Sequence, residues 1–229
     1  MPTFDIIKEV KPKQTFRVAS VIGKFDLQSE HIIEHFQGNI EIPEKWQIGL
    51  IVGKSGTGKT TIAKQLFPDS YITNFEYNQE TVLDDMPKEC SVEQITSAFN
   101  SVGFSSPPSW LKPYSVLSNG QKMRVDLARA ILDEKEFFVF DEFTSVVDRN
   151  VAQIGSFAMQ KAIRKTDKKF IAVTCHFDVQ DWLLPDWVFN TDTMTFQSFE
   201  GQKKNRPEIK FEIYQTPDKS IWKMFAKYH

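Results

Sequence analysis

The chain has 229 residues, a length typical of one large domain or of one domain with an appendage. Hydrophobic residues make up 41% and charged residues 25% of it, which excludes a disordered or fibrous chain. The net charge of −2 excludes a broadly basic surface that coats nucleic acid, although a local basic patch remains compatible with it.

The sequence contains no recognisable targeting or membrane segment. Its first ten residues mix acidic and apolar side chains and lack an apolar core of signal-peptide length. The longest apolar runs, at 48–52, 137–140 and 170–173, fall far short of the ~20 residues that a membrane-spanning helix needs. Without a signal peptide, Cys90 and Cys175 indicate reduced thiols, and we expect a cytoplasmic protein.

The first third of the chain is predicted to contain strands and one helix. Residues 16–22 have the composition of a strand. Residues 47–52 form a compact apolar run that stops at a glycine, the pattern of a buried parallel strand. A helix is expected over 59–67, where Pro68 ends it, and residues 70–75 form a further candidate strand.

The middle of the chain is predicted to be mainly helical. Ser91 and Gln94 have the spacing of a capping box, which predicts a helix to about residue 102. Three prolines lie within residues 105–113, and we therefore expect an extended loop without a helix there. A long helix is expected to start at Ser118, because apolar residues recur at helical spacing after it.

The remainder of the chain alternates strands with a helix. Apolar runs predict strands at 137–140 and 170–173, and residues 148–165 between them predict a helix. This alternation predicts an α/β fold with a largely parallel sheet. Two or three short strands are expected in the tail, near residues 187–190, 194–199 and 208–214.

The strongest chemical signal lies directly after the predicted strand at 47–52. Residues 53–60 have a glycine followed after four residues by Gly-Lys-Thr, which is the phosphate-loop pattern. In such a loop, backbone N–H groups and the positive end of the following helix face the phosphates. Lys59 can reach the β- and γ-phosphates, and the Thr60 hydroxyl can ligate Mg²⁺. The residues predicted to bind nucleotide here are Gly53, Lys54, Ser55, Gly56, Thr57, Gly58, Lys59, Thr60 and Thr61.

Two adjacent carboxylates follow the predicted strand at 137–140. Asp141 and Glu142 stand at its C-terminal end, and ligands bind at that edge in open α/β sheets. Asp141 is suited to holding Mg²⁺, and Glu142 is suited to polarising a water that attacks the γ-phosphate. Two solvated acids at the start of a loop are the alternative interpretation, which the phosphate-loop pattern disfavours.

A third motif precedes the Asp-Glu strand by one helix. It reads Leu-Ser-Asn-Gly-Gln over residues 117–121. By itself it predicts only a helix cap, but at this position it resembles the signature motif, usually Leu-Ser-Gly-Gly-Gln, of the ATP-binding-cassette (ABC) ATPases. Asn119 replaces the first glycine, a mild departure because asparagine tolerates left-handed conformations. The motif residues are Leu117, Ser118, Asn119, Gly120 and Gln121, and the helix after them carries Arg124 and the run Ala128-Arg129-Ala130.

Two later segments also resemble ABC ATPases. One runs from a residue that resembles the catalytic glutamate, Glu142, to one that resembles the D-loop aspartate, Asp148, although Phe143 stands where proline is usual. The other ends in His176, which resembles the switch histidine placed after the next strand. Together the four ordered motifs imply a P-loop NTPase of ABC type, with a mostly parallel sheet, an antiparallel β subdomain and a small helical insert.

The resemblance also implies domain limits, cofactors and an assembly. It implies an ABC-type nucleotide-binding domain over 1–195, with the helical insert at about 80–135 and a C-terminal β extension over 196–229. It implies hydrolysis of ATP in the presence of Mg²⁺ by two domains paired head to tail as a homodimer. The signature of one subunit closes over the γ-phosphate held by the other, which implies catalytic roles for Glu142, His176 and Lys59 and nucleotide contacts in trans from Ser118, Asn119, Gly120 and Gln121, with Asp148 beside them.

Two elements of the family are harder to locate in the sequence. A glutamine that contacts Mg²⁺ usually follows the third strand; Gln79 is the candidate, and a surface glutamine is the alternative. An aromatic residue from an early strand usually stacks on adenine. Phe25 and Phe16 both qualify, but with 20 phenylalanines in the chain either one is equally compatible with a place in the core.

The type of ABC ATPase is suggested by the short insert. Only residues 80–117 are available for the helical subdomain that docks transporter subunits on membrane partners, which favours a soluble, non-transporting member. Segments at 110–114, 140–149, 173–179 and 184–188 resemble ABC-type ATPases that are fused to GNAT-like acetyltransferase domains. No acetyltransferase domain of ordinary size is expected within these 229 residues.

Three functions remain open at this stage. They are a soluble ATPase that switches between dimer and monomer on an unknown protein or nucleic-acid partner, the ATP-binding subunit of a membrane transporter, and a nucleotide sensor with negligible hydrolysis. Two basic clusters are either phosphate contacts for nucleic acid or, more simply, solvated surfaces. They consist of Lys161, Arg164, Lys165, Lys168 and Lys169, and of Lys203, Lys204 and Arg206.

Overall fold

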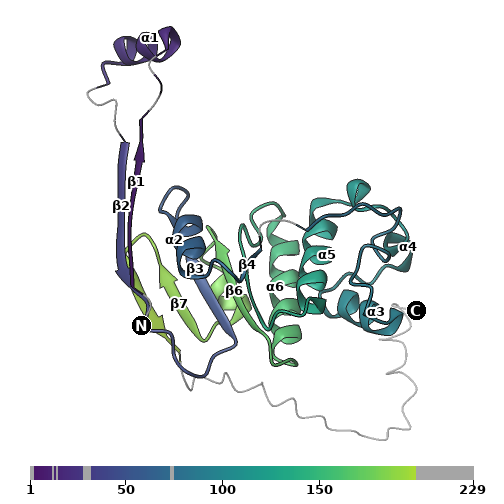
Figure 1. Ribbon diagram of the computed structural model, residues 1–229. Helices are drawn as coiled ribbons and strands as arrows, with labels where there is room; N and C mark the ends of the chain where they lie inside the picture. Colours follow the sequence, from purple (N-terminus) through teal and green to yellow (C-terminus); the bar gives the residue numbers. More distant parts are fainter. Residues whose placement is uncertain (1–2, 12, 14, 28–31, 73–74, 200–229) are drawn as a thin grey trace, which may run out of the picture.

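The structure is a computed structural model, in which residues 3–11, 13, 15–27, 32–72 and 75–199 are described (Figure 1). Its main sheet has six strands in the order β4-β5-β6-β3-β7-β8. All neighbouring pairs are parallel except β7 with β8, which confirms the predicted α/β fold with a mostly parallel sheet. The strands are β3 (Ile48–Val52), β4 (Tyr71–Ile72), β5 (Phe137–Phe140), β6 (Lys169–Thr174), β7 (Trp187–Asn190) and β8 (Thr195–Ser198).

Alternate residues of the central strand β3 belong to two different cores. Ile48, Leu50 and Val52 are buried in a cluster that includes Phe99 of the helical insert. Ile51 points the other way, into a second cluster that includes residues of the helix α2 (Lys59–Leu66) and of a separate pair of antiparallel strands. Because both faces of this strand are covered, its sequence is an uninterrupted apolar run rather than an alternating one.

Helices flank the sheet, and those between β4 and β5 form the insert (Figure 1). The insert is small, as the sequence predicts. Its two longest helices, α3 and α5, both begin at a capping box, on Ser91 and Ser118. The helices of the body are α2 (Lys59–Leu66), α3 (Val92–Ser101), α4 (Pro107–Trp110), the 3₁₀ helix η1 (Tyr114–Val116), α5 (Asn119–Leu132), α6 (Arg149–Ile163) and α7 (Val179–Leu183).

A separate two-stranded antiparallel sheet, β1 (Thr3–Val10) with β2 (Ile32–Asn39), projects beside α2, and the helix α1 (Phe16–Phe25) lies at its far end (Figure 1). The hairpin packs on the main sheet through Phe4, whose ring centroid is 5.7 Å from that of Phe189. This confirms the expected antiparallel sheet apart from the main one.

The expected strand at 16–22 is wrong, because these residues form most of α1. Thr15 caps this helix by accepting a hydrogen bond from the backbone N–H of Val18. Apolar residues at 18, 22 and 25 recur at helical spacing, which the strand-like composition concealed.

The structure also differs from the expected loop at 105–113 and from the expected strand at 70–75. A helix-free loop at 105–113 is wrong, since Pro107 and Pro108 open the short helix α4. Proline is tolerated in the first turn of a helix because the N–H groups there have no intrahelical partner. Of the strand expected at 70–75, only β4 forms among the described residues, and the strand expected at 208–214 lies outside them.

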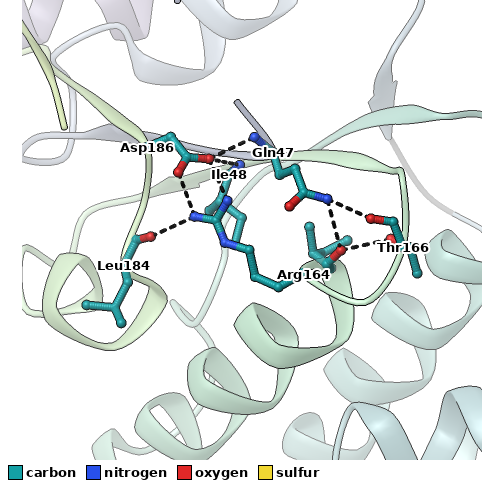
Figure 2. Close-up of polar contacts among 7 residues, drawn as sticks. Gln47, Ile48, Arg164, Thr166, Leu184 and Asp186 are labelled. Carbon is teal, nitrogen blue, oxygen red and sulfur yellow. Dashed lines mark hydrogen bonds and ion pairs between the residues drawn. The ribbon is translucent and has the colours of Figure 1, made fainter. Parts of the chain in front are cut away.

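A polar network joins the starts of β3 and β7 to the end of α6 (Figure 2). Asp186 accepts hydrogen bonds from the backbone N–H groups of Gln47 (2.7 Å) and Ile48 (3.0 Å). It also accepts two from the guanidinium of Arg164, at 2.8 and 2.7 Å. Arg164, which the sequence places in a basic cluster, is therefore a structural residue.

Candidate nucleotide-binding site

The phosphate-loop pattern lies where it was predicted, between β3 and α2. Gly56 and Gly58 have φ values of 86° and 83°, a region that favours glycine, and Gly58 is the N-cap of α2. The side chain of Lys59 is buried against the loop, and its Nζ donates to the carbonyl of Lys54 at 2.6 Å. The ammonium therefore lies inside the curve of the loop, where it can meet phosphate oxygens.

Thr60 and Asp141, two of the three predicted metal contacts, meet in the structure. The Thr60 hydroxyl, in the first turn of α2, donates to Asp141 Oδ2 at 2.7 Å. Asp141 follows β5, two strands away from β3 in the sheet. A hydroxyl and a carboxylate are the hard oxygen ligands that Mg²⁺ takes in proteins, so the pair fits this ion.

Asp141 is held in place by two further donors. Its side chain accepts hydrogen bonds from the hydroxyl of Tyr71 in β4 and from the backbone N–H of Glu142, the latter at 2.8 Å. Burial and the neighbouring Asp141 raise the pKa of Tyr71, so the phenol stays protonated and remains a donor. The carboxylate thus has a fixed orientation toward the phosphate loop.

Glu142 and His176 lie on the same edge of the sheet, after β5 and β6. Glu142 is exposed and has a φ of 52°, while the next turn brings Thr144 Oγ1 to 3.3 Å from His176 Nδ1. Burial and the charge of Arg149 lower the pKa of His176, although the carboxylates of Asp178 and Glu142 act in the opposite direction. The imidazole is therefore mainly neutral at pH 7.

The signature motif forms the N-terminus of α5. The Ser118 hydroxyl accepts the N–H of Gln121 at 3.4 Å, and the Gln121 side chain accepts the N–H of Ser118 at 3.0 Å. Gly120 packs close to α6, because a Cβ at this position would lie 3.0 Å from Val151 Cγ1. Asp148 caps α6 by accepting the N–H groups of Asn150 and Val151, so the signature and the D-loop residue start neighbouring helices.

Several predicted site residues lie elsewhere. Phe25 and Phe16 are 66% and 88% exposed on α1, at the end of the hairpin that is distant from the phosphate loop (Figure 1). Gln79 is exposed, and its backbone N–H donates to Asp85 at 3.1 Å. A cavity of about 510 Å³ opens beside Asp141 and Glu142, and Gln79 is not one of its lining residues.

Residues outside the sequence motifs support the phosphate loop, two of them directly after β7. Thr191 Oγ1 is 2.6 Å from Thr57 Oγ1, and Asp192 Oδ1 accepts the N–H of Lys54 at 2.7 Å. A Cβ on Gly53 would lie 2.2 Å from Thr191 Oγ1, so the loop begins at a residue where only glycine fits. A Cβ on Gly58 would lie 2.6 Å from Cε1 of Phe36 in β2. No local signal marks these residues, since they reach the loop only through the tertiary structure: Thr191 and Asp192 through the pairing of β7 with β3, and Phe36 through the packing of β2.

Comparisons with known proteins found similarity to ABC proteins in sequence and in fold. Residues 69–145 match the family described as ABC transporter. The fold is similar to a dimeric post-hydrolysis state of the ATP-binding cassette MJ0796 bound to ADP and phosphate, with a TM-score of 0.54, 16% identity, and coverage of 69% of this chain and 87% of that chain. The structure thus has the fold of the ABC nucleotide-binding cassettes.

The curated proteins that are similar to this chain are longer than it. One is the lactococcin-G-processing and transport ATP-binding protein LagD of Lactococcus lactis subsp. lactis, 28% identical over 182 residues, which cover 62% of this chain and 25% of LagD. Another is the mRNA export factor elf1 of Schizosaccharomyces pombe, 25% identical over 177 residues, which cover 67% of this chain and 16% of elf1. The chain thus spans a quarter or less of the length of these two proteins. Among its described residues, no helix is long and apolar enough to cross a membrane.

Proposed function

We propose that this ABC-type domain binds ATP with Mg²⁺ and hydrolyses it to ADP and phosphate. The observation that carries the proposal is the hydrogen bond of 2.7 Å between Thr60 and Asp141. It joins a hydroxyl at the end of a phosphate loop to a carboxylate at the edge of the sheet, which is the oxygen pair that a nucleotide-bound Mg²⁺ requires.

The remaining residues have chemically distinct tasks. Lys59 supplies a buried positive charge to the β- and γ-phosphates, together with the loop N–H groups. Bound Mg²⁺ would be held by Thr60 and Asp141 and would neutralise charge on the same phosphates. Glu142 accepts a proton from the attacking water, and His176 orients that water and the γ-phosphate. The mainly neutral imidazole of His176 can donate or accept a hydrogen bond at the γ-phosphate.

The proposed active form is a head-to-tail dimer. Ser118 and Gly120 lie at the N-terminus of a 14-residue helix, where free N–H groups and the helix dipole favour an anion. In the dimer this end faces the γ-phosphate held by the partner. The family match over residues 69–145, which include the signature motif, supports this assignment.

We further propose that the chain is of the soluble, non-transporting type and acts on a protein partner. The helical insert supports this, because apart from α5 it has only α3 and the short helices α4 and η1. The resemblance to ABC ATPases that are fused to GNAT-like domains points the same way. The transporter alternative is favoured by the similarity to LagD, a transport ATP-binding protein, and it predicts co-purification with a multi-spanning membrane protein.

A nucleic-acid partner is less well supported. In the first basic cluster Arg164 pairs with Asp186, Lys168 Nζ donates to the carbonyls of Asp133 and Lys135, and Lys169 lies over the Trp46 ring. Only two lysines of that cluster have no such described contact. The second cluster, at 203–206, lies outside the described residues.

A steady-state ATPase assay tests the proposed reaction. Glu142→Gln keeps the shape of the side chain and removes the base, so the rate is expected to fall ~10²–10⁴-fold. Glu134→Gln, an exposed glutamate after α5, is the matched control and should keep the wild-type rate. Hydrolysis that survives in Glu142→Gln would contradict the base assignment, and absence of hydrolysis in the wild type would favour the nucleotide sensor.

Light scattering coupled to size exclusion tests the dimer. Glu142→Gln should bind MgATP without cleaving it, because Lys59, Thr60 and the loop N–H groups are unchanged. It should shift from monomer to dimer with MgATP, but not with MgADP, which lacks the γ-phosphate that the partner's signature contacts. A variant that stays monomeric at saturating MgATP would argue for a monomeric nucleotide-binding domain.

A further inference from the structure

Two tyrosines and a carboxylate form a half-buried cluster on the side of helix α5, which begins after Ser118. The rings of Tyr77 and Tyr114 are stacked, with centroids 3.9 Å apart and planes within 2° of parallel. Their hydroxyls donate to the two different oxygens of Asp126, at 2.7 and 2.8 Å. Asp126 belongs to α5, Tyr77 to the segment after β4, and Tyr114 to η1, so the cluster joins three parts of the chain.

Neighbouring turns of α5 strengthen the same connection. The guanidinium of Arg129 lies 5.0 Å from the centre of the Phe75 ring and 4.9 Å from that of Tyr77. It also donates to the carbonyl of Glu76 at 2.5 Å. One turn before Asp126, Lys122 Nζ lies 5.5 Å over the Tyr114 ring. Residues four and three apart share one face of a helix, and this face of α5 holds the segment at 75–77.

The cluster lies between the two halves of the proposed composite site. α5 starts at Ser118, about two turns before Asp126. The segment at 75–77 follows β4, whose Tyr71 donates to Asp141. Tyr114 and Asp126 line the cavity of about 510 Å³ that also borders Asp141 and Glu142, so the side of α5 that faces the catalytic carboxylates is not closely packed on them.

The charged side chain of Asp126 loses hydration at this position, which costs free energy of folding. Burial raises its pKa, while the hydrogen bonds from Tyr77 and Tyr114 and the charge of Arg129 act in the opposite direction. An apolar side chain would fill the same space without this cost, whereas two donors on one carboxylate define a geometry. The cluster therefore favours a role in orientation over one in packing.

We propose that Asp126, Tyr77 and Tyr114 form a latch that positions helix α5, and with it Ser118, relative to the strand that ends at Asp141. Asp126 is a positioning residue, since it reaches the reacting groups only through α5. The inference rests on the proposed function, because the orientation of Ser118 matters only if it completes the partner's ATP site. The latch governs closure of the dimer and leaves nucleotide binding by the chain's own phosphate loop unaffected.

The test uses Tyr77→Phe and Tyr114→Phe, which keep the stacked rings and remove the two hydroxyls. Both are introduced singly and together in the Glu142→Gln chain. Ser101→Ala is the matched control, because it removes a hydroxyl that donates to a carbonyl within α3, away from the cluster. The measurements are the protein concentration of half-dimerisation with MgATP, the affinity for MgADP by calorimetry, and the unfolding temperature.

We expect the double variant to need at least tenfold more protein for half-dimerisation, equivalent to about 1.4 kcal/mol. Its affinity for MgADP should stay within twofold of the parent, and Ser101→Ala should match the parent in both measurements. A lower unfolding temperature with an unchanged dimerisation midpoint would show that the cluster is only structural and would overturn the inference. Failure of the Glu142→Gln parent itself to dimerise would instead refute the proposed dimer, and the inference would fall with it.

Discussion

Replacement of Asp186 by alanine is expected to destabilise the fold without impairing the nucleotide site. The carboxylate accepts four hydrogen bonds, two from backbone N–H groups at the start of β3 and two from Arg164 (Figure 2). Alanine would leave the N–H of the fully buried Ile48 without this acceptor and would deprive a guanidinium of its counter-charge.

The size of the effect follows from the partial burial of the ion pair. Loss of one partner costs about 3–5 kcal/mol in a fully buried pair and about 0–1 kcal/mol in an exposed one. The side chains of Arg164 and Asp186 are 30% and 24% exposed, which places this pair between those limits, nearer the buried one because of the two backbone bonds. We expect the free energy of unfolding to fall by about 2–4 kcal/mol, which corresponds to a fall in the unfolding temperature of about 5–12 °C for a chain of this size.

The assay is urea unfolding of Asp186→Ala and wild type at pH 7 and near pH 3. Burial raises the pKa of Asp186, but the hydrogen bonds from Arg164 and from the N–H groups of Gln47 and Ile48 outweigh it, so the pKa lies below its ordinary value. A lowered pKa in the folded state adds stability above the unfolded pKa of ~3.9, and this stability is lost as the pH falls through the folded pKa. The difference in free energy of unfolding between wild type and Asp186→Ala should therefore be smaller near pH 3 than at pH 7.

The matched control is Asp178→Ala, because Asp178 also pairs with an arginine but is 47% exposed. Asp178→Ala should lower the free energy of unfolding by no more than about 1 kcal/mol. Affinity for MgATP should be unchanged in Asp186→Ala, since Asp186 borders the start of β3 and the phosphate loop follows its end. A loss at pH 7 no larger than that of the control, or one that is the same at both pH values, would refute the reasoning.

Two further predictions concern the phosphate loop and the composite site. Lys59→Ala removes a charge-assisted contact worth roughly 1.5–3 kcal/mol, so calorimetry should show an affinity for MgATP at least tenfold weaker, whereas Lys161→Ala on an exposed turn of α6 should bind normally. Unchanged affinity in Lys59→Ala would refute the loop assignment. A mixture of Ser118→Arg and Lys59→Ala chains should regain part of the ATPase activity that each lacks, because one site of the mixed dimer keeps an intact loop and an intact signature. Lack of any rescue would argue against sites shared between subunits.

The elements that the sequence predicted correctly are those with local causes. The phosphate loop needs only glycines, a lysine and a threonine in a fixed order between a strand and a helix. The capping box at Ser91 involves side chains three residues apart and forms as expected, and Ser118 begins a helix as predicted, there too with a capping box. The apolar runs at β3, β5 and β6 reflect burial on both faces, which any parallel sheet imposes.

The incorrect predictions arose where local patterns compete. Residues 16–22 contain valine and isoleucine, which favour strands, but the cap on Thr15 and the spacing of the apolar residues produce α1. Because Phe16 and Phe25 belong to α1, they lie at the far end of β1 and β2 and not on an early strand beside the phosphate loop (Figure 1). The composition of a short segment does not distinguish these outcomes.

What the sequence determined by itself is the set of chemical groups and their order along the chain, because each motif depends on residues a few positions apart. The tertiary structure alone decided which distant residues complete the site. Thr57 and Thr191 are 134 positions apart, and they touch only because β7 lies next to β3 in the sheet. In the same way, Tyr77 and Tyr114 meet on Asp126 only because α5 packs against the segment after β4. Contacts of this kind depend on strand order and helix packing, which no pattern within a single short segment encodes.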